Sequence, residues 1–133
     1  MDNIYITRTS ESPEVDFNFS NHVLNMTGES YPENASDFFR PILIGLEAYL
    51  AATSACEIVF NFQLTYFNSS STKMLYNLFE LLNESASTND NRIILNWHHD
   101  EEDDTILEFG LDIHEDFQWL DFRPIILDNA EEA

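Results

Sequence analysis

The chain has 133 residues, 44% of them hydrophobic and 14% aromatic, so it can bury one core and is not expected to be disordered. Twenty-five acidic residues against five basic ones give a net charge of −20, which leaves no basic stripe for a nucleic-acid backbone or an anionic membrane. We therefore expect neither among its partners, and no stretch approaches the roughly 20 apolar residues of a membrane span.

Apolar periodicity predicts the secondary structure, because strands repeat every second residue and helices about every 3.6. In chain order it predicts strands over 4–7, 15–19 and 22–26, a turn over 27–30, a helix over 38–50 capped by Asn34 or Ser36, a strand over 57–67, a helix over 74–82, a strand over 93–97, an acidic loop over 98–104, a helix over 106–117, and an edge strand or extended tail over 122–127. Pro41 is expected in the first turns of its helix or at a kink.

This order predicts an α/β fold built on one mixed sheet. The opening strands suit an antiparallel hairpin, whereas strand-helix-strand alternation in the later half implies parallel pairing. About three helices should pack mainly on one face, because the strand over 57–67 has one apolar and one polar side. We expect a single domain over 1–133, with a core at about 15–126 and a flexible acidic tail over 128–133.

Cysteine usage and the start of the chain indicate the compartment. Cys56 is the sole cysteine, so no intramolecular disulfide can form. The opening residues have neither the basic region nor the apolar run of a signal peptide. We expect a cytoplasmic protein.

The junction over 64–74 is the most informative segment. A strand ends there and a helix begins, so free backbone N–H groups and the positive end of the helix dipole should face a run of hydroxyls, with Lys73 nearby. A serine of the run Ser69–Ser71 is a candidate phosphorylation site, which would gain charge and acceptor oxygens. The alternative is that these residues are ordinary helix caps.

Three segments carry a family resemblance: GESYPEN over Gly28–Asn34, YFNSSSTK over Tyr66–Lys73, and NWHHD over Asn96–Asp100 with the acids that follow. In order and separation they resemble the SiaC family of bacterial regulatory phosphoproteins. The likeness extends over about 15–126. It implies a STAS-like fold, akin to anti-sigma-factor antagonists.

The resemblance also implies a non-catalytic partner switch without a cofactor. A kinase with a histidine-kinase-type ATPase domain would phosphorylate Ser69, and a PP2C-type phosphatase would remove the phosphate. The unmodified form would bind and activate a diguanylate cyclase. Well-known members have Thr where this chain has Ser69, and Ser70 and Ser71 are alternatives. The implied partner-binding residues are Tyr31, Pro32, Glu33, Asn34, Tyr66, Asn68, Ser70 and Lys73.

Two other functions compete with the switch. His98, His99 and the following acids, with His114 beyond them, suggest a metal-assisted hydrolase, since imidazoles and carboxylates are metal ligands. However, neighbours on a strand face opposite ways, and the glycine-rich, HExxH and GxSxG motifs are absent. The net charge alternatively suggests an acidic nucleic-acid mimic that inhibits a basic protein.

Overall fold

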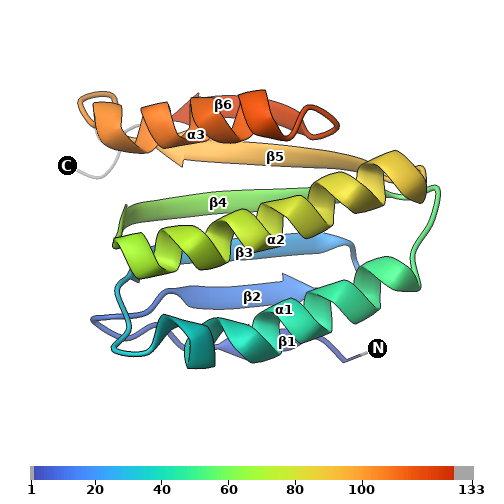
Figure 1. The fold of residues 1–133 in the computed structure, drawn as a ribbon, viewed down its shortest axis with the longest axis horizontal. Coiled ribbons are helices and arrows are strands. Elements are labelled where there is room, and N and C mark those ends of the chain that lie inside the picture. Colours follow the sequence, from blue (N-terminus) through green and yellow to red (C-terminus); the bar gives the residue numbers. More distant parts are fainter. Residues whose placement is uncertain (1, 128–133) are drawn as a thin grey trace.

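The computed structural model describes residues 2–127, so the expected acidic tail over 128–133 lies outside the described residues. The chain forms a six-stranded sheet and three helices (Figure 1). In chain order these are β1 (Ile4–Ile6), β2 (Glu14–Asn18), β3 (Val23–Ser30), α1 (Ala35–Ala51), β4 (Glu57–Phe67), α2 (Ser69–Thr88), β5 (Arg92–His99), α3 (Asp104–Asp116) and β6 (Asp121–Ile126). None of the described helices is long and apolar enough to cross a membrane.

The sheet follows the chain, with strand order β1-β2-β3-β4-β5-β6. The first two pairs are antiparallel, and β3 through β6 run parallel. All three helices cover the same face of the sheet (Figure 1). The expected mixed sheet, with helices on one face, is confirmed.

The core lies between that face and the helices. In β4 the buried residues are Ile58, Phe60, Phe62 and Leu64, each 1% exposed or less. The indole of Trp97 stacks on Phe62 with ring centroids 4.1 Å apart, and its Nε1 donates to the Ile106 carbonyl at 2.9 Å. The one polar atom of this large side chain is therefore satisfied inside the core.

The face without helices is polar along its middle. Asn61 Nδ2 donates to Asn25 Oδ1 at 2.8 Å, and Asn96 Nδ2 donates to Asn61 Oδ1 at 2.9 Å. This row joins β3, β4 and β5 through side chains in addition to their backbone pairing. It also explains the polar alternation that the sequence shows in these strands.

Several boundaries differ from the expected ones, and three of them lie at the edge of the sheet where β3, β4 and β5 end. Strand β3 continues through the expected turn to Ser30, and β5 continues to His99 inside the expected acidic loop. Gly28, Ser30 and His99 are buried where the pattern would need large apolar residues, so apolar periodicity does not register these ends. Helix α2 begins at Ser69, five residues before the expected start at 74. The apolar pattern misses these residues because the first turn of the helix is polar.

Two expectations about α1 and β6 are confirmed. Asn34 caps α1, its side chain accepting from the Asp37 N–H at 3.1 Å, and Pro41 lies in the second turn of that helix. The last segment forms an edge strand: β6 pairs with β5 from Asp121 to Ile126 and includes Pro124. Proline is tolerated there because an edge strand need not donate on both sides.

Two helical glycines give a matched test of core packing. A Cβ at Gly110 would lie 2.6 Å from Trp97 Cε2, in the middle of a rigid buried ring, whereas one at Gly45 would lie 2.6 Å from the free end of Ile4. We expect Gly110→Ala to lower the free energy of unfolding by ~1–3 kcal/mol, since overpacking outweighs the gain in helix propensity. Gly45→Ala should be neutral or stabilising. Urea unfolding measures both, and equal effects would contradict this packing.

Candidate functional site

The strand-to-helix turn after β4 is capped by an asparagine. Asn68 Oδ1 accepts from the Ser71 N–H at 2.9 Å, and the Asn68 carbonyl accepts from the Thr72 N–H at 2.9 Å. Asn68 thus satisfies a backbone donor that an N-terminal helix turn would otherwise leave free. The cap function is therefore filled without any of the three serines.

The three serines have different environments. Ser69 and Ser70 are exposed in the first turn of α2, and their hydroxyls have no hydrogen-bond partner among the described residues. Ser71 is fully buried, and its Oγ lies 2.8 Å from Ser30 Oγ. An enzyme can reach Ser69 and Ser70 as the turn stands, whereas reaching Ser71 requires the turn to open.

The first two sequence motifs meet at this turn. The Asn68 N–H donates to the Ser30 carbonyl at 3.0 Å, so the end of β3 contacts the start of α2. Beside this contact the rings of Tyr31 and Tyr66 meet edge to face, with centroids 5.7 Å apart. Tyr31 is 36% exposed and Tyr66 49% exposed. They form an aromatic pair on the surface, and Tyr66 precedes Ser69 by three residues.

The other expected partner-binding residues follow Tyr31 and Tyr66 in the same two segments of the chain. Glu33, Asn34, Ser70 and Lys73 are exposed, and Pro32 is half-buried. Lys73 lies one helical turn after Ser69, so both occupy the same side of α2. Asn34 and Asn68 also have structural roles as helix caps, so their presence does not require a partner.

Arg8 is a basic residue at this edge that the sequence interpretation missed. A Cβ added to Gly28 would lie 2.9 Å from Arg8 Nε, so the arginine side chain covers this glycine of β3. Gly28 has φ +123°, in the left-handed region that favours glycine, and it adjoins an irregularity in the β3–β4 register. Only the strand order could have placed Arg8 here, because β1 runs parallel to β3 and so ends at the same edge of the sheet.

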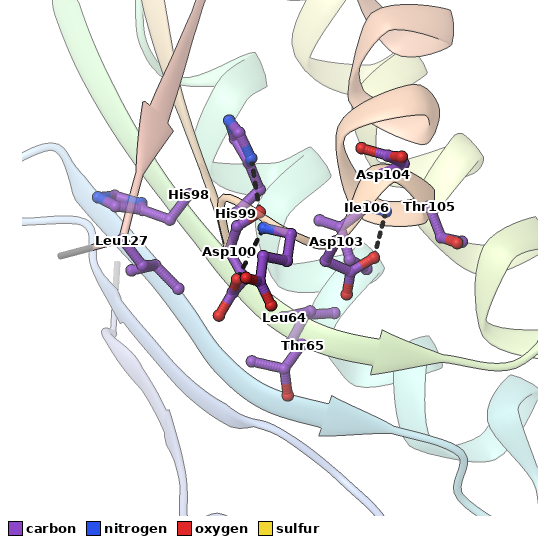
Figure 2. A pocket seen from close by; sticks show the side chains of 11 residues that line it. Leu64, Thr65, His98, His99, Asp100, Asp103, Asp104, Thr105, Ile106 and Leu127 are labelled. Carbon is purple, nitrogen blue, oxygen red and sulfur yellow. Dashed lines mark hydrogen bonds between the residues drawn. The ribbon is translucent and has the colours of Figure 1, made fainter. Parts of the chain in front are cut away.

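The third motif lines a cavity of about 670 Å³ at the carboxyl edge of the parallel strands (Figure 2). Thr65 of β4, His98 and His99 of β5, and the acidic residues before α3 contribute to its wall. Asp103 caps α3 by accepting from the Ile106 N–H at 3.2 Å. Part of the acidic run therefore has a structural purpose.

The two histidines of this motif point apart (Figure 2). His98 Nδ1 lies 3.3 Å from the Phe62 carbonyl on the open face, and buried His99 has Nδ1 3.1 Å from the Asp100 carbonyl. His114 stacks on Phe122 instead. Across the described residues no three His, Cys, Asp or Glu side chains come together as a metal site. Residues 2–127 therefore offer no set of metal ligands for the hydrolase hypothesis.

Tyr76 fixes α2 to α3. Its hydroxyl donates to Asp116 Oδ2 at 2.9 Å, and its ring meets Phe109 and Phe117. Burial, followed by the hydrogen bond to Asp116, raises the pKa of Tyr76 to about 12. The phenol therefore stays protonated at neutral pH and keeps this contact. The helix that bears the serines is held at both its start and its middle.

Comparison with known proteins identifies the class of this fold and turn as that of regulatory phosphoproteins. The model of the SiaC family of regulatory phosphoproteins matches residues 6–127. The chain belongs to the SiaC family. The family resemblance inferred from the three motifs is thereby confirmed.

Relatives from Pseudomonas aeruginosa support this. The chain is 28% identical over 116 residues to an uncharacterized protein of strain UCBPP-PA14, covering 87% of this chain and 90% of that one. It matches apo-SiaC of P. aeruginosa with a TM-score of 0.84 at 27% identity, covering 93% and 98% of the two chains. It also matches the crystal structure of the diguanylate cyclase SiaD in complex with its activator SiaC, with a TM-score of 0.83 at 26% identity, covering 91% and 97%.

The cap geometry predicts a graded effect of substitution at Asn68. Replacing Asn68 with Ala removes the acceptor for the Ser71 N–H and should lower the free energy of unfolding by ~1 kcal/mol. Asn68→Ser keeps a capping oxygen and should stay close to the parent chain. Thermal unfolding followed by circular dichroism compares the two, and equal losses would mean that capping is not what Asn68 contributes.

Proposed function

We propose that this protein is a non-catalytic partner switch controlled by phosphorylation of Ser69. The observation that carries the proposal is the exposed Ser69 hydroxyl, which is free of hydrogen bonds in the described chain and belongs to the turn that follows Tyr66 of the Tyr31–Tyr66 pair. Ser70 is the alternative acceptor, because it is exposed as well. The buried hydrogen bond of Ser71 makes it the least suitable of the three.

In the proposed cycle a kinase with a histidine-kinase-type ATPase domain transfers a phosphoryl group to Ser69 Oγ, and a PP2C-type phosphatase hydrolyses it. The first turn of α2 tolerates the phosphate, because the helix dipole and the free N–H groups of the turn favour negative charge. Modification would then leave the fold intact and change only the surface. The switch therefore acts on binding and not on folding.

Phosphorylation should release a partner. The modified serine would gain roughly −1.5 to −2 charges on a surface that must lose water when a partner docks. Lys73 is the one base on the same helix, so the phosphate has no arginine cluster on α2 to receive it. Burying one poorly paired charge costs several kcal/mol, enough to end a micromolar interaction.

The proposed partner of the unmodified form is a diguanylate cyclase. SiaC of P. aeruginosa is described as the activator of the cyclase SiaD in their complex, and this chain shares that fold over nearly its full length. The Tyr31–Tyr66 pair supplies the exposed aromatic surface that binding hot spots favour. In this arrangement the cyclase catalyses the reaction and this chain controls its activity.

Substitution at Ser69 tests the switch. In binding to a diguanylate cyclase encoded by the same organism, Ser69→Ala should retain the affinity of the parent chain, whereas Ser69→Asp should weaken it at least tenfold by charging the interface. Ser54→Asp is the matched control: Ser54 is exposed before β4, at the opposite edge of the sheet, and should have no effect. Unchanged binding of the Ser69→Asp variant would contradict the mechanism.

Peptide mass spectrometry of the protein from its own cells, with phosphatases inhibited, identifies the modified residue. We expect phosphate on the exposed part of the turn, at Ser69 or Ser70. Phosphate confined to Ser71 would overturn the assignment, because it requires loss of the Ser30–Ser71 hydrogen bond.

A further inference from the structure

A groove runs between α1 and α2 on the outer side of the helical layer, away from the Ser69 turn. Two adjoining hollows of about 340 and 250 Å³ share Glu47, Leu81 and Glu84, so they form one continuous depression. On α2 it reaches from Asn77 to Thr88, about 16 Å at 1.5 Å per residue. The two helices lie side by side over the sheet (Figure 1).

The groove has an apolar floor and acidic walls. Leu43, Leu50 and Leu81 supply the floor, and Glu47, Glu80 and Glu84 stand along the sides. All three glutamates are exposed, and none joins an ion pair in the described chain, where the four ion pairs involve Arg40, Arg92 and Arg123. No lysine or arginine lines either hollow.

We propose that this groove binds a basic amphipathic helix of about three turns from a partner protein. Apolar side chains on one stripe of such a helix would contact the leucines, and flanking Lys or Arg side chains would reach the glutamates. This is helix-in-groove recognition, with the length of the groove setting the length of the ligand.

Charge decides between this occupant and the others. A second copy of this chain is unsuited, because Arg40 and Lys73 are the only arginine or lysine residues of its described helices and the whole chain has a net charge of −20. An anionic membrane would likewise be repelled. A cationic helix is the occupant that neutralises the walls while it covers the floor.

Binding in the groove is independent of the Ser69 switch. Asn77 is the groove residue of α2 nearest to Ser69, and it lies eight residues further along the helix, about 12 Å. A phosphate on Ser69 therefore does not reach the ligand. The groove would therefore bind its ligand in both phosphorylation states, whereas the surface at the Ser69 turn would bind its partner only in the unmodified state.

The test uses a synthetic peptide of about 12 residues, with leucines at helical spacing and lysines on the flanks. A scrambled peptide of the same composition lacks the apolar stripe. Chemical shifts of the ¹⁵N-labelled protein should change along α1 and α2 with the first peptide. Glu47→Gln with Glu84→Gln should weaken binding roughly tenfold, as expected for the loss of two partly exposed ion pairs.

Matched controls separate specific binding from general attraction. Glu101→Gln with Glu102→Gln removes the same charge from the exposed turn after β5 and should change affinity less than twofold. Ser69→Asp should leave peptide binding unchanged, so failure of the groove and failure of the switch give different results. Equal binding of the scrambled peptide, or equal weakening by both glutamine pairs, would overturn the proposal.

Discussion

The parallel pairing of β3 with β4 is the constraint on which the candidate site depends. It places Gly28 beside Leu64 and Ser30 beside Phe67, so the two strands end at the same edge. Only then can the Asn68 N–H reach the Ser30 carbonyl, and only then do Tyr31 and Tyr66 meet. The long-range contact that builds the surface is thus a property of the sheet and not of either loop.

The turn before α2 combines a hydrogen-bonded backbone with exposed serine hydroxyls in a few residues. The Ser30–Ser71 hydrogen bond and the Asn68 cap fix the start of α2 from below, while Ser69 and Ser70 remain exposed above. A chemical group added to the exposed side meets a backbone that is already held in place. Such preorganisation means that a binding partner spends little of its interaction energy on ordering the loop.

The sequence predicted those features that large apolar residues encode. Alternation in β4 and the helical spacing of α1 were sufficient to predict a sheet covered by helices on one face. The three motifs were sufficient to recognise the family. The strand ends at Ser30 and His99 could not be seen, because buried polar residues replace apolar ones there. The burial of Ser71 was predictable in principle, since it precedes Leu75 at helical spacing, whereas the position of Arg8 required the strand order.

The edge strand β6 is poorly suited to pair with a further strand. Leu127 donates its N–H to the His99 carbonyl at 2.8 Å, and alternation along the strand then turns the nitrogens of residues 123 and 125 toward β5 and that of Pro124 outward. Proline has no hydrogen to offer there, and Arg123, its neighbour, is exposed and charged. A strand added beside β6 would find no N–H donor at Pro124, in the middle of the ladder. This missing donor protects the aromatic-rich chain against edge-to-edge aggregation.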